Sequence, residues 1–346
     1  EGKQLVKELK TLYASCGMNV HKWLSNKVEV IETVPTEERA SNIDISEIQV
    51  KYDPLLPSVK TLGMIYLSIE DNFTFTCKLF VTDLWTKRKI LKAYMRLFDP
   101  LNLIVAFIIT ARIVFQRCWE LKLTWDDAVP DAILKIWYKW LDSLKDLVHL
   151  RIPRFVREPN KKPIEKSLHI FSDGSSDAYA ACCYLLTRYE DGSRSCHLIM
   201  TRAKVKPLKL NSIPRIELLG ATLGLKLALK VNKVYDLPIN ELHFWSDSKT
   251  VLFWLRITTR SLKTFVENRV SVIQEESFVS HWRYCPSKLN PADRATRGVS
   301  VKELTNDDLW WHAPEFLCGE PSLWPRQDDL QLKQATEDIL AEMKSK

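Results

Sequence analysis

The sequence predicts an α/β protein that contains a mixed five-stranded sheet with flanking helices, preceded by a small β-hairpin and a helical segment. The main observation is the order of segments in the second half of the chain. Residues 168–203 hold three strand-like runs, and the second and third are joined by the turn sequence Glu190-Asp-Gly-Ser193. Helix-like and strand-like segments then alternate up to residue 297. Three antiparallel strands followed by this alternation predict a mixed sheet covered by helices.

The first 150 residues predict a small sheet followed by a helical bundle. A helix-like segment opens the chain, a strand is expected at Met18–Trp23, and residues 34–57 are polar with three prolines, typical of a loop. Two strands are expected at Val59–Tyr66 and Phe73–Leu79, with the turn at residues 70–72. Helical spacing predicts three helices, in the segments 87–97, 104–119 and 128–147, the first ended by Phe98-Asp-Pro100. The tryptophan stripe of the third helix is interpreted as core rather than as a surface for stacking bases.

A proline-rich, basic stretch without periodicity, residues 151–166, is predicted to be a linker. The domain that follows should span residues 167–300, and residues 301–346 are expected to form a C-terminal extension. Its predicted strands are Leu168–Asp173, Tyr179–Tyr189, Ser195–Ala203, Leu242–Ser246 and Val279–Tyr284. Its predicted helices start near Glu217, span Lys249–Arg256 and Leu262–Glu276, and start again near Asp293.

Composition limits the classes of protein that need to be considered. The 346 residues suggest two or more domains, and no run of 18 uncharged apolar residues exists, so no membrane span is expected. The eight cysteines are scattered without a CxxC pair, which indicates neither a zinc site nor a disulfide framework. The net charge of +7 is compatible with a polyanionic partner. Without a secretory signal we expect a cytoplasmic or nuclear location, and a first residue other than Met fits a piece of a longer polypeptide.

Four acidic residues lie at positions where a carboxylate is unfavourable unless it has a specific function. Asp173 and Asp247 each end an apolar strand-like run, and Glu217 and Asp293 lie at predicted helix starts. In the expected topology the first and fourth strands are parallel neighbours, so their carboxyl ends meet at one edge. Carboxylates that converge repel one another unless a divalent ion lies between them. Ligands that are all oxygen favour Mg²⁺, and two such ions can cleave a phosphodiester.

Each of these acids also has a purely structural explanation. Asp247 could be a helix N-cap, Glu217 could favour a helix dipole, Asp293 could be a cap or first-turn acid, and Asp173 could belong to a turn. The joint arrangement is much harder to explain in this way than any single acid. We therefore interpret the four as one functional set.

Basic and small polar side chains near the acids are candidate contacts to a nucleic-acid backbone. The best stripe is Thr201–Lys209, which leads into the Glu217 helix. The candidate binding residues are Lys204, Lys206, Lys209, Asn211, Arg215 and Lys288. A solvated basic loop is the alternative interpretation of the stripe.

The motifs around the acids resemble a known family. Phe171-Ser-Asp-Gly-Ser175, Ile213-Pro-Arg-Ile-Glu-Leu218, Trp245-Ser-Asp-Ser248 and Pro286–Gly298 resemble the ribonuclease H domain of BEL/Pao-type LTR retrotransposon polyproteins. Residues 309–317 look like the segment that follows that domain. Gly17–Asn26 and Leu62–Tyr66 resemble the region just after the polymerase active site. Residues 1–150 would then be a thumb or connection remnant of a reverse transcriptase.

This resemblance implies a function for the four acids. Asp173, Glu217, Asp247 and Asp293 would hold two Mg²⁺ ions, with Mn²⁺ as an alternative, in an RNase H-like fold. The enzyme would cut the RNA strand of an RNA–DNA hybrid and leave 5′-phosphate and 3′-hydroxyl ends. The expected partners are the hybrid and the rest of a pol polyprotein, namely its polymerase palm, protease and integrase, in a virus-like particle or replication complex.

The sequence departs from that family pattern in two ways. The loop before Asp293 lacks the His that many relatives carry, and His281 lies in the preceding predicted strand. No Tyr/Phe-x-Asp-Asp motif occurs, so the chain alone should not polymerise DNA. Other hydrolases fit less well, because position 175 is Ser where exonucleases have Asp-x-Glu, integrases end their acid set with Glu, and no Asp-Thr/Ser-Gly of an aspartic peptidase is present.

Two other functions remain open from the sequence. One is a non-catalytic nucleic-acid-binding or assembly module from a decayed or host-adopted retroelement. The other is an interaction protein whose helical segment binds a partner.

Overall fold

Packing divides the chain into two compact units. The computed structural model describes residues 1–42, 55–61, 63–77, 82–325 and 337–344. The first unit comprises residues 1–80, 95–100 and 141–155, and the second comprises residues 81–94, 101–140 and 156–346. The domain limits expected at residues 150, 166 and 300 remain predictions, because a division by packing does not by itself define functional domains.

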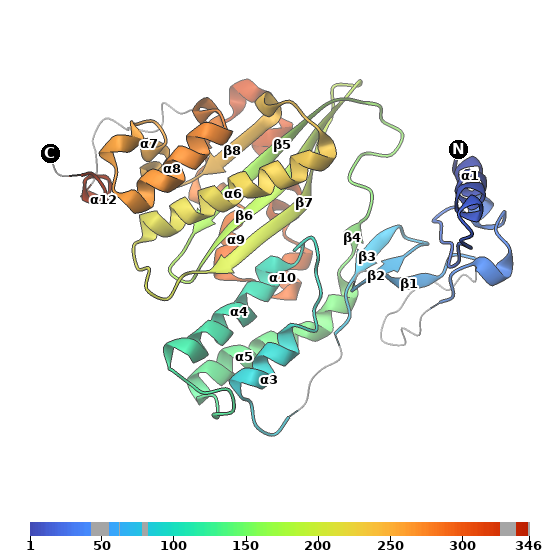
Figure 1. Ribbon diagram of the computed structural model, residues 1–346, viewed down its shortest axis with the longest axis horizontal. Coiled ribbons are helices and arrows are strands. Elements are labelled where there is room, and N and C mark those ends of the chain that lie inside the picture. Colours follow the sequence, from blue (N-terminus) through green and yellow to red (C-terminus); the bar gives the residue numbers. More distant parts are fainter. Residues whose placement is uncertain (43–54, 62, 78–81, 326–336, 345–346) are drawn as a thin grey trace. The chain divides into compact units, whose positions relative to one another are not determined.

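The first unit contains a helix and a small antiparallel sheet (Figure 1). The expected opening helix is α1 (Gly2–Ser15), which packs Val6 against Ile31 of α2 (Val28–Ile31). The sheet order is β1-β2-β3-β4, and every neighbouring pair is antiparallel. Its strands are β1 (Ser58–Thr61), β2 (Met64–Leu67), β3 (Asn72–Thr74) and β4 (Ile152–Pro153).

Three strand predictions in this unit were wrong in detail. Met18–Trp23 is not a strand, since only Trp23 forms an isolated bridge there, with Arg39. Val59–Tyr66 is not one strand but the two arms of a hairpin, because Gly63 adopts a φ of +82° that other residues rarely reach. The expected strand Phe73–Leu79 forms β strand only to Thr74, and its residues 78 and 79 lie outside the described part.

The second unit is built on the five-stranded mixed sheet that the sequence predicts. The order is β7-β6-β5-β8-β9, with β5–β8 and β8–β9 parallel and the other pairs antiparallel. The strands are β5 (Pro163–Gly174), β6 (Ala178–Tyr189), β7 (Arg194–Val205), β8 (Leu242–Ser246) and β9 (Trp282–Tyr284). The last strand starts three residues later than expected, because Val279–His281 forms a 3₁₀ turn.

The helices follow the predicted order. The second unit holds α3 (Lys87–Tyr94), α4 (Val105–Glu120), most of α5 (Asp131–Ser143), α6 (Ile213–Tyr235), α7 (Lys249–Trp254), α8 (Thr264–Glu276), α9 (Ala292–Arg297), α10 (Val301–Thr305), α11 (Asp308–His312) and α12 (Glu337–Ala341). Trp137 and Trp140 are buried, so the tryptophan stripe is core, as predicted. Among the described residues, no helix has the length and apolar character needed to cross a bilayer.

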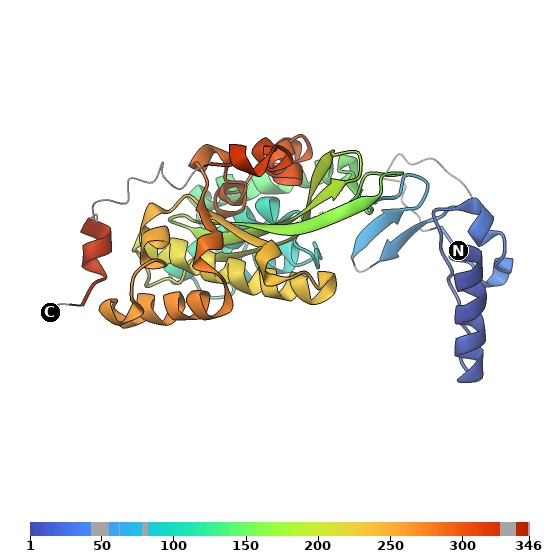
Figure 2. The ribbon, with the colours of Figure 1, turned by 90° about the horizontal axis from the view of Figure 1, so that it is seen from above.

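Both faces of the five-stranded sheet are covered (Figure 2). Helices α6 and α8 pack on one face, against a core that includes Leu168, Ile170 and Phe244. On the other face Trp245 contacts Phe316 and Trp324, which both belong to the segment after α11. The Tyr184 hydroxyl donates a hydrogen bond of 2.8 Å to the carbonyl oxygen of Trp310 on the same face.

Two glycines let the end of β5 touch the start of α6. A Cβ on Gly174 would lie 2.5 Å from the backbone nitrogen of Glu217, and a Cβ on Gly220 would lie 2.4 Å from the carbonyl oxygen of Asp173. Real Cβ atoms do not approach backbone atoms that closely. The segment Glu217-Leu-Leu-Gly220 therefore packs α6 against the end of β5 at one close distance between the two backbones.

We expect Gly220→Ala to lower the free energy of unfolding by at least about 1–3 kcal/mol, because the added methyl group has to push α6 away from β5. Urea denaturation of the whole chain measures this change. Gly224→Ala is the matched control on the same helix. Its Cβ would meet only side chains, the nearest at 3.2 Å, so it should be close to neutral. Equal losses for both variants would show that the contact is not tight.

Candidate active site

Asp173 and Asp247 lie at the same edge of the sheet and on the same face. In the parallel pair β5–β8, Phe171 is opposite Trp245 and Ser172 is opposite Ser246. Asp173 is the next residue of β5 and Asp247 directly follows β8, so the two acids lie at the ends of neighbouring strands, close enough for the charge of Asp247 to raise the pKa of Asp173. Asp173 is 7% exposed. The expected meeting of the two acids at the carboxyl ends of these strands is confirmed.

Glu217 joins them through the glycine contact between β5 and α6. It lies four residues after the helix start at Ile213, so it is not in the first turn, contrary to expectation. The helix starts early because Pro214 occupies one of the first two helical positions, where no amide hydrogen is needed. The Ser248 hydroxyl donates a hydrogen bond of 2.6 Å to Glu217 Oε2, which connects α6 to the start of α7.

Asp293 lies in the first turn of α9, as predicted, and shares a partner with Asp173. The Thr296 hydroxyl donates to Asp173 Oδ2 at 2.5 Å and also lies 3.1 Å from the carbonyl oxygen of Asp293. The Asp293 carboxylate itself accepts a hydrogen bond from Arg297 Nε and lies 3.9 Å from Arg294 Nη1. All four acids therefore belong to one end of the sheet, but Asp293 is turned toward arginines.

Asn290 positions the loop that brings Asp293 to the sheet. It is fully buried, and its Nδ2 donates to the carbonyl oxygen of Ser172 at 3.0 Å and to Asp247 Oδ1 at 3.2 Å. Its Oδ1 accepts from the backbone nitrogen of Ala292 at 3.1 Å. One side chain thus connects β5, the acid that follows β8, and the start of α9.

Burial and mutual repulsion shift the proton affinities of two of the acids. Burial, with the nearby charge of Asp247, raises the pKa of Asp173 to about 6, although the Thr296 hydrogen bond opposes this shift. Burial also raises the pKa of Glu217 to about 7, with smaller contributions from the charges of Asp247 and Asp173, while the hydrogen bond from Ser248 opposes the shift. Such shifts are expected where carboxylates converge without a cation.

The donor set suits a hard divalent ion, although the side chains are not yet arranged around one. Four carboxylates offer only oxygen ligands, which Mg²⁺ and Mn²⁺ accept. Within the described residues, no three His, Cys, Asp or Glu side chains form a ready metal-binding group. Two of the four carboxylates already have other partners, because Glu217 accepts a hydrogen bond from Ser248 and Asp293 accepts one from Arg297. A cation would have to compete with these contacts.

The structure also tests the simpler explanations of these acids. The N-cap of α7 is Ser248, which accepts from Val251 N, so Asp247 is not a cap. Asp293 makes no cap hydrogen bond, and Asp173 is part of β5 rather than of a turn. Glu217 lies beyond the first turn of α6, where a helix dipole has most of its effect.

The six predicted nucleic-acid contacts lie in three places. Lys204 lies in the last two residues of β7, and Lys206, Lys209 and Asn211 follow that strand, with Lys206 Nζ 3.4 Å from Asn211 Oδ1. Arg215 is held by Glu342 through two hydrogen bonds of 2.6 and 2.8 Å. Lys288 is exposed in the turn Ser287–Leu289, close in sequence to Asn290. Their role in binding remains a prediction.

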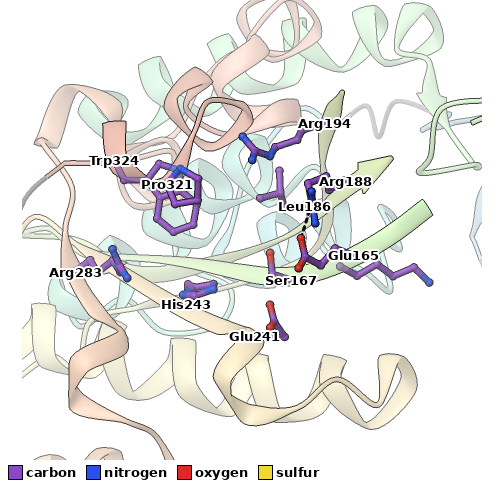
Figure 3. A pocket seen from close by; sticks show the side chains of 11 residues that line it. Glu165, Ser167, Leu186, Arg188, Arg194, Glu241, His243, Arg283, Pro321 and Trp324 are labelled. Atoms are coloured by element: carbon purple, nitrogen blue, oxygen red, sulfur yellow. Dashed lines mark hydrogen bonds and ion pairs between the residues drawn. The ribbon is translucent and has the colours of Figure 1, made fainter. Parts of the chain in front are cut away.

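His281 cannot replace the His that is missing from the loop. It precedes β9, and its Nδ1 lies 3.1 Å from the carbonyl oxygen of Leu242, at the amino end of β8. The acids lie at the carboxyl end of that strand. A pocket of about 270 Å³ opens near the same amino ends, lined by residues such as Glu165, His243, Arg283 and Trp324 (Figure 3). None of the four acids lines it.

Sequence reasoning did not identify three side chains that hold the acids in place. These are Ser248, Asn290 and Thr296, which hydrogen-bond Glu217, Asp247 and Asp173 respectively. Asn290 and Thr296 lie within the motif Pro286–Gly298, so the sequence alone places them near Asp293. It does not place them against β5, more than a hundred residues away.

Without divalent ions, neutralising Glu217 should stabilise the protein at alkaline pH. The folded state holds the pKa near 7, above its ordinary 4.5, so it binds more protons than the unfolded state between these values. Stability from this group therefore falls as pH rises from about 4.5 to about 7. We expect Glu217→Gln to gain about 1–3 kcal/mol at pH about 8, and nothing below pH about 4.5.

Urea denaturation in chelator across this pH range measures the difference between variant and parent. Glu275→Gln, which changes an exposed glutamate of α8, is the control and should give parallel curves. A Glu217→Gln curve parallel to that of the parent would contradict the shifted pKa.

Replacing Asn290 by alanine should remove the support of two buried backbone groups and of Asp247. The carbonyl oxygen of Ser172 and the amide of Ala292 would each lose a partner. We expect the free energy of unfolding to fall by about 2–4 kcal/mol. Asn240→Ala, at an exposed site, should change it by less than about 0.5 kcal/mol. A loss as small as that of the control would mean that Asn290 does not organise this end of the sheet.

Part of this chain is similar to known proteins. A search of curated proteins finds no match. Among solved structures, the chain is similar to the N-terminal RNase H domain of Rv2228c from Mycobacterium tuberculosis, determined as a fusion with maltose binding protein. That match has 15% identity and a TM-score of 0.25, and covers 38% of this chain and 94% of the other.

The family comparison covers the helices α3–α5 and most of the sheet. Residues 86–248 match the Pao retrotransposon-like RNaseH-like domain. The matched segment contains Asp173, Glu217 and Asp247, and ends before Asp293. This agrees with the resemblance carried by the sequence motifs. Residues 86–248 of this chain are therefore similar to the Pao retrotransposon-like RNaseH-like domain family.

Proposed function

We propose that this protein is a metal-dependent ribonuclease H that cleaves the RNA strand of RNA–DNA hybrids. The observation that carries the proposal is the meeting of Asp173, Glu217 and Asp247 at one end of the central parallel strands, with Asp293 on the adjoining helix. It is supported by the RNaseH-like family of the segment that contains the first three. Acids gathered at a cost in repulsion are typical of active sites.

The four carboxylates would hold two Mg²⁺ ions, or Mn²⁺ in their place. When bound, such ions supply an activated water and stabilise the charge of the leaving oxygen. Asp173 and Glu217 would release their protons on binding, because a ligand carboxylate has to be ionised. Asp293 would exchange its contact with Arg297 for the metal, which leaves the Arg297 guanidinium at the rim of the site, near the substrate phosphates.

The surrounding residues fit a polyanionic substrate. Lys204, Lys206, Lys209, Asn211 and Lys288 would contact the hybrid backbone, and Arg215 could do so only by leaving Glu342. By its family, the chain would act within a retrotransposon pol polyprotein, beside a polymerase palm, a protease and an integrase. No polymerase activity is expected from the residues present, since the Tyr/Phe-x-Asp-Asp motif does not occur.

One observation favours a second candidate function. Asp293 is bound to Arg297 and, among the described side chains, no ready group of three metal ligands exists. A protein that keeps this arrangement in the presence of Mg²⁺ would bind hybrid without cutting it. That is the non-catalytic binding module, and the same experiment separates the two.

We expect the chain to cleave the RNA strand of an end-labelled RNA–DNA hybrid in Mg²⁺ or Mn²⁺. Asp247→Asn should lower the rate by at least about 100-fold, because a carboxylate that binds the ions is lost. Gel analysis of the labelled strand measures the rate. Asp131→Asn, in the exposed first turn of α5, is the control and should cleave like the parent.

Tight hybrid binding without cleavage in either metal would contradict the nuclease and support the binding module. Cleavage that persists in Asp247→Asn would indicate a contaminating enzyme or a different site.

A further inference from the structure

A second feature of the same unit suits a nucleic-acid strand. An open groove of about 610 Å³ lies between α4 and the end of β7, and we call it the α4–β7 groove. It is lined by Tyr94, Arg112, Phe115, Trp119, Lys204 and Leu208, among others. Arg112 Nη1 donates to the carbonyl oxygen of Ala203 at 2.9 Å, and Gln116 Nε2 donates to that of Lys206 at 2.5 Å. These bonds fix the strand end to the helix and so hold the groove open.

One wall of the groove is aromatic and partly exposed. Phe115 lies between Tyr94 and Trp119, with ring centroids 6.0 and 6.4 Å away. Trp119 is 45% exposed although Lys87 Nζ lies over its ring, 3.6 Å from the centroid, and Leu208 on the facing segment is 51% exposed. Large apolar side chains that remain uncovered next to a groove usually mark a binding surface.

Basic residues outnumber acidic ones around this wall, although Arg88 pairs with Asp126 and Arg117 with Asp177. Helix α3 carries four basic residues and no acid, and residues 201–209 also carry four and no acid. Helix α4 carries Arg112 and Arg117 and one acid, Glu120. Lys204 is exposed and has no acidic partner among the described residues. A surface that binds another protein through apolar contacts does not require this excess of positive charge. A surface that binds a phosphate backbone does.

The groove lies close to the candidate active site. The backbone nitrogen of Lys206 donates to the carbonyl oxygen of Asp177 at 2.9 Å, and Arg117 lies 3.8 Å from the carboxylate of Asp177. Asp177 is only four residues after Asp173, a span of at most about 14 Å. A strand that runs from the carboxylates along this loop would therefore reach the groove within a few nucleotides.

We propose that the α4–β7 groove binds single-stranded nucleic acid that continues from the hybrid at the carboxylates. Its bases would stack on Trp119 and the neighbouring rings, and its phosphates would lie near Lys204. Stacking accepts any base, so the groove would bind without sequence preference. That the strand continues from a hybrid rests on the proposed function, but the binding of a single strand does not.

Binding to a labelled oligothymidylate of about 12 nucleotides, followed by fluorescence anisotropy in chelator, tests this proposal. Trp119→Ala should weaken binding roughly 5- to 150-fold, the effect of losing one or more stacked bases. Lys204→Ala, an exposed change that should not disturb folding, should lower the slope of log affinity against log salt by about 0.7. Tyr138→Ala is the matched control, since Tyr138 is an exposed aromatic residue of α5.

The outcomes separate this proposal from its alternatives. If Trp119→Ala and Lys204→Ala both bind the oligonucleotide as Tyr138→Ala does, the proposal is wrong. If Trp119→Ala instead changes the association state in light scattering, the groove is a protein contact and the proposal is again wrong. Loss of nuclease activity would leave this readout unaffected, because it needs neither metal nor cleavage. As a further check, a single-stranded extension on the hybrid should tighten binding to the parent but not to Trp119→Ala.

Discussion

The backbone contact between β5 and α6 is the constraint on which the candidate site depends. Gly174 and Gly220 face the backbones of Glu217 and Asp173, so the helix lies as close to the strand as atoms permit. The strand cannot yield, because β6 and β8 bond it on both sides. Glu217 is thereby held beside Asp173 by main-chain geometry, without any direct bond between the two carboxyl groups.

That closeness has an electrostatic consequence. Burial raises the pKa of both Asp173 and Glu217, and the charge of Asp247 adds to the effect in each. Each acid nonetheless keeps a hydrogen-bond donor, namely Thr296, Ser248, Asn290 or Arg297. These donors lessen the repulsion without removing it. The proposed metal ions would remove this repulsion, so binding them would stabilise the protein.

The sequence predicted those parts of the fold that depend on local pattern. Apolar runs ending in Asp173 and Asp247 and the turn at residues 190–193 predicted the mixed five-stranded sheet and the meeting of the two acids, and the helical spacing near Trp137 predicted α5. Errors arose where one residue decided the outcome, such as the positive φ of Gly63, or the helix start near Pro214. Contacts between distant segments left no local pattern. Asn290 reaches Ser172 across more than a hundred residues, and nothing near Lys204 indicated that α4 would lie beside it.

The five-stranded sheet also needs segments beyond its own strands to cover it. Trp245 follows the alternation of β8 onto the face opposite α6, where it contacts Phe316 and Trp324. Trp310 lies on that face too, and its Nε1 donates to the carbonyl oxygen of Leu103, just before α4. Without residues 301–325, Trp245 would face water, at a cost of roughly 1.5–3 kcal/mol, and without the segment that carries α4, Trp310 would lose its hydrogen-bond acceptor at Leu103. Helix α9, which carries Asp293 and Thr296, packs against α4, and the amide of Val299, just after α9, donates to the carbonyl oxygen of Ala106. The position of Asp293 therefore depends on segments that precede the five-stranded sheet in the sequence and on segments that follow it.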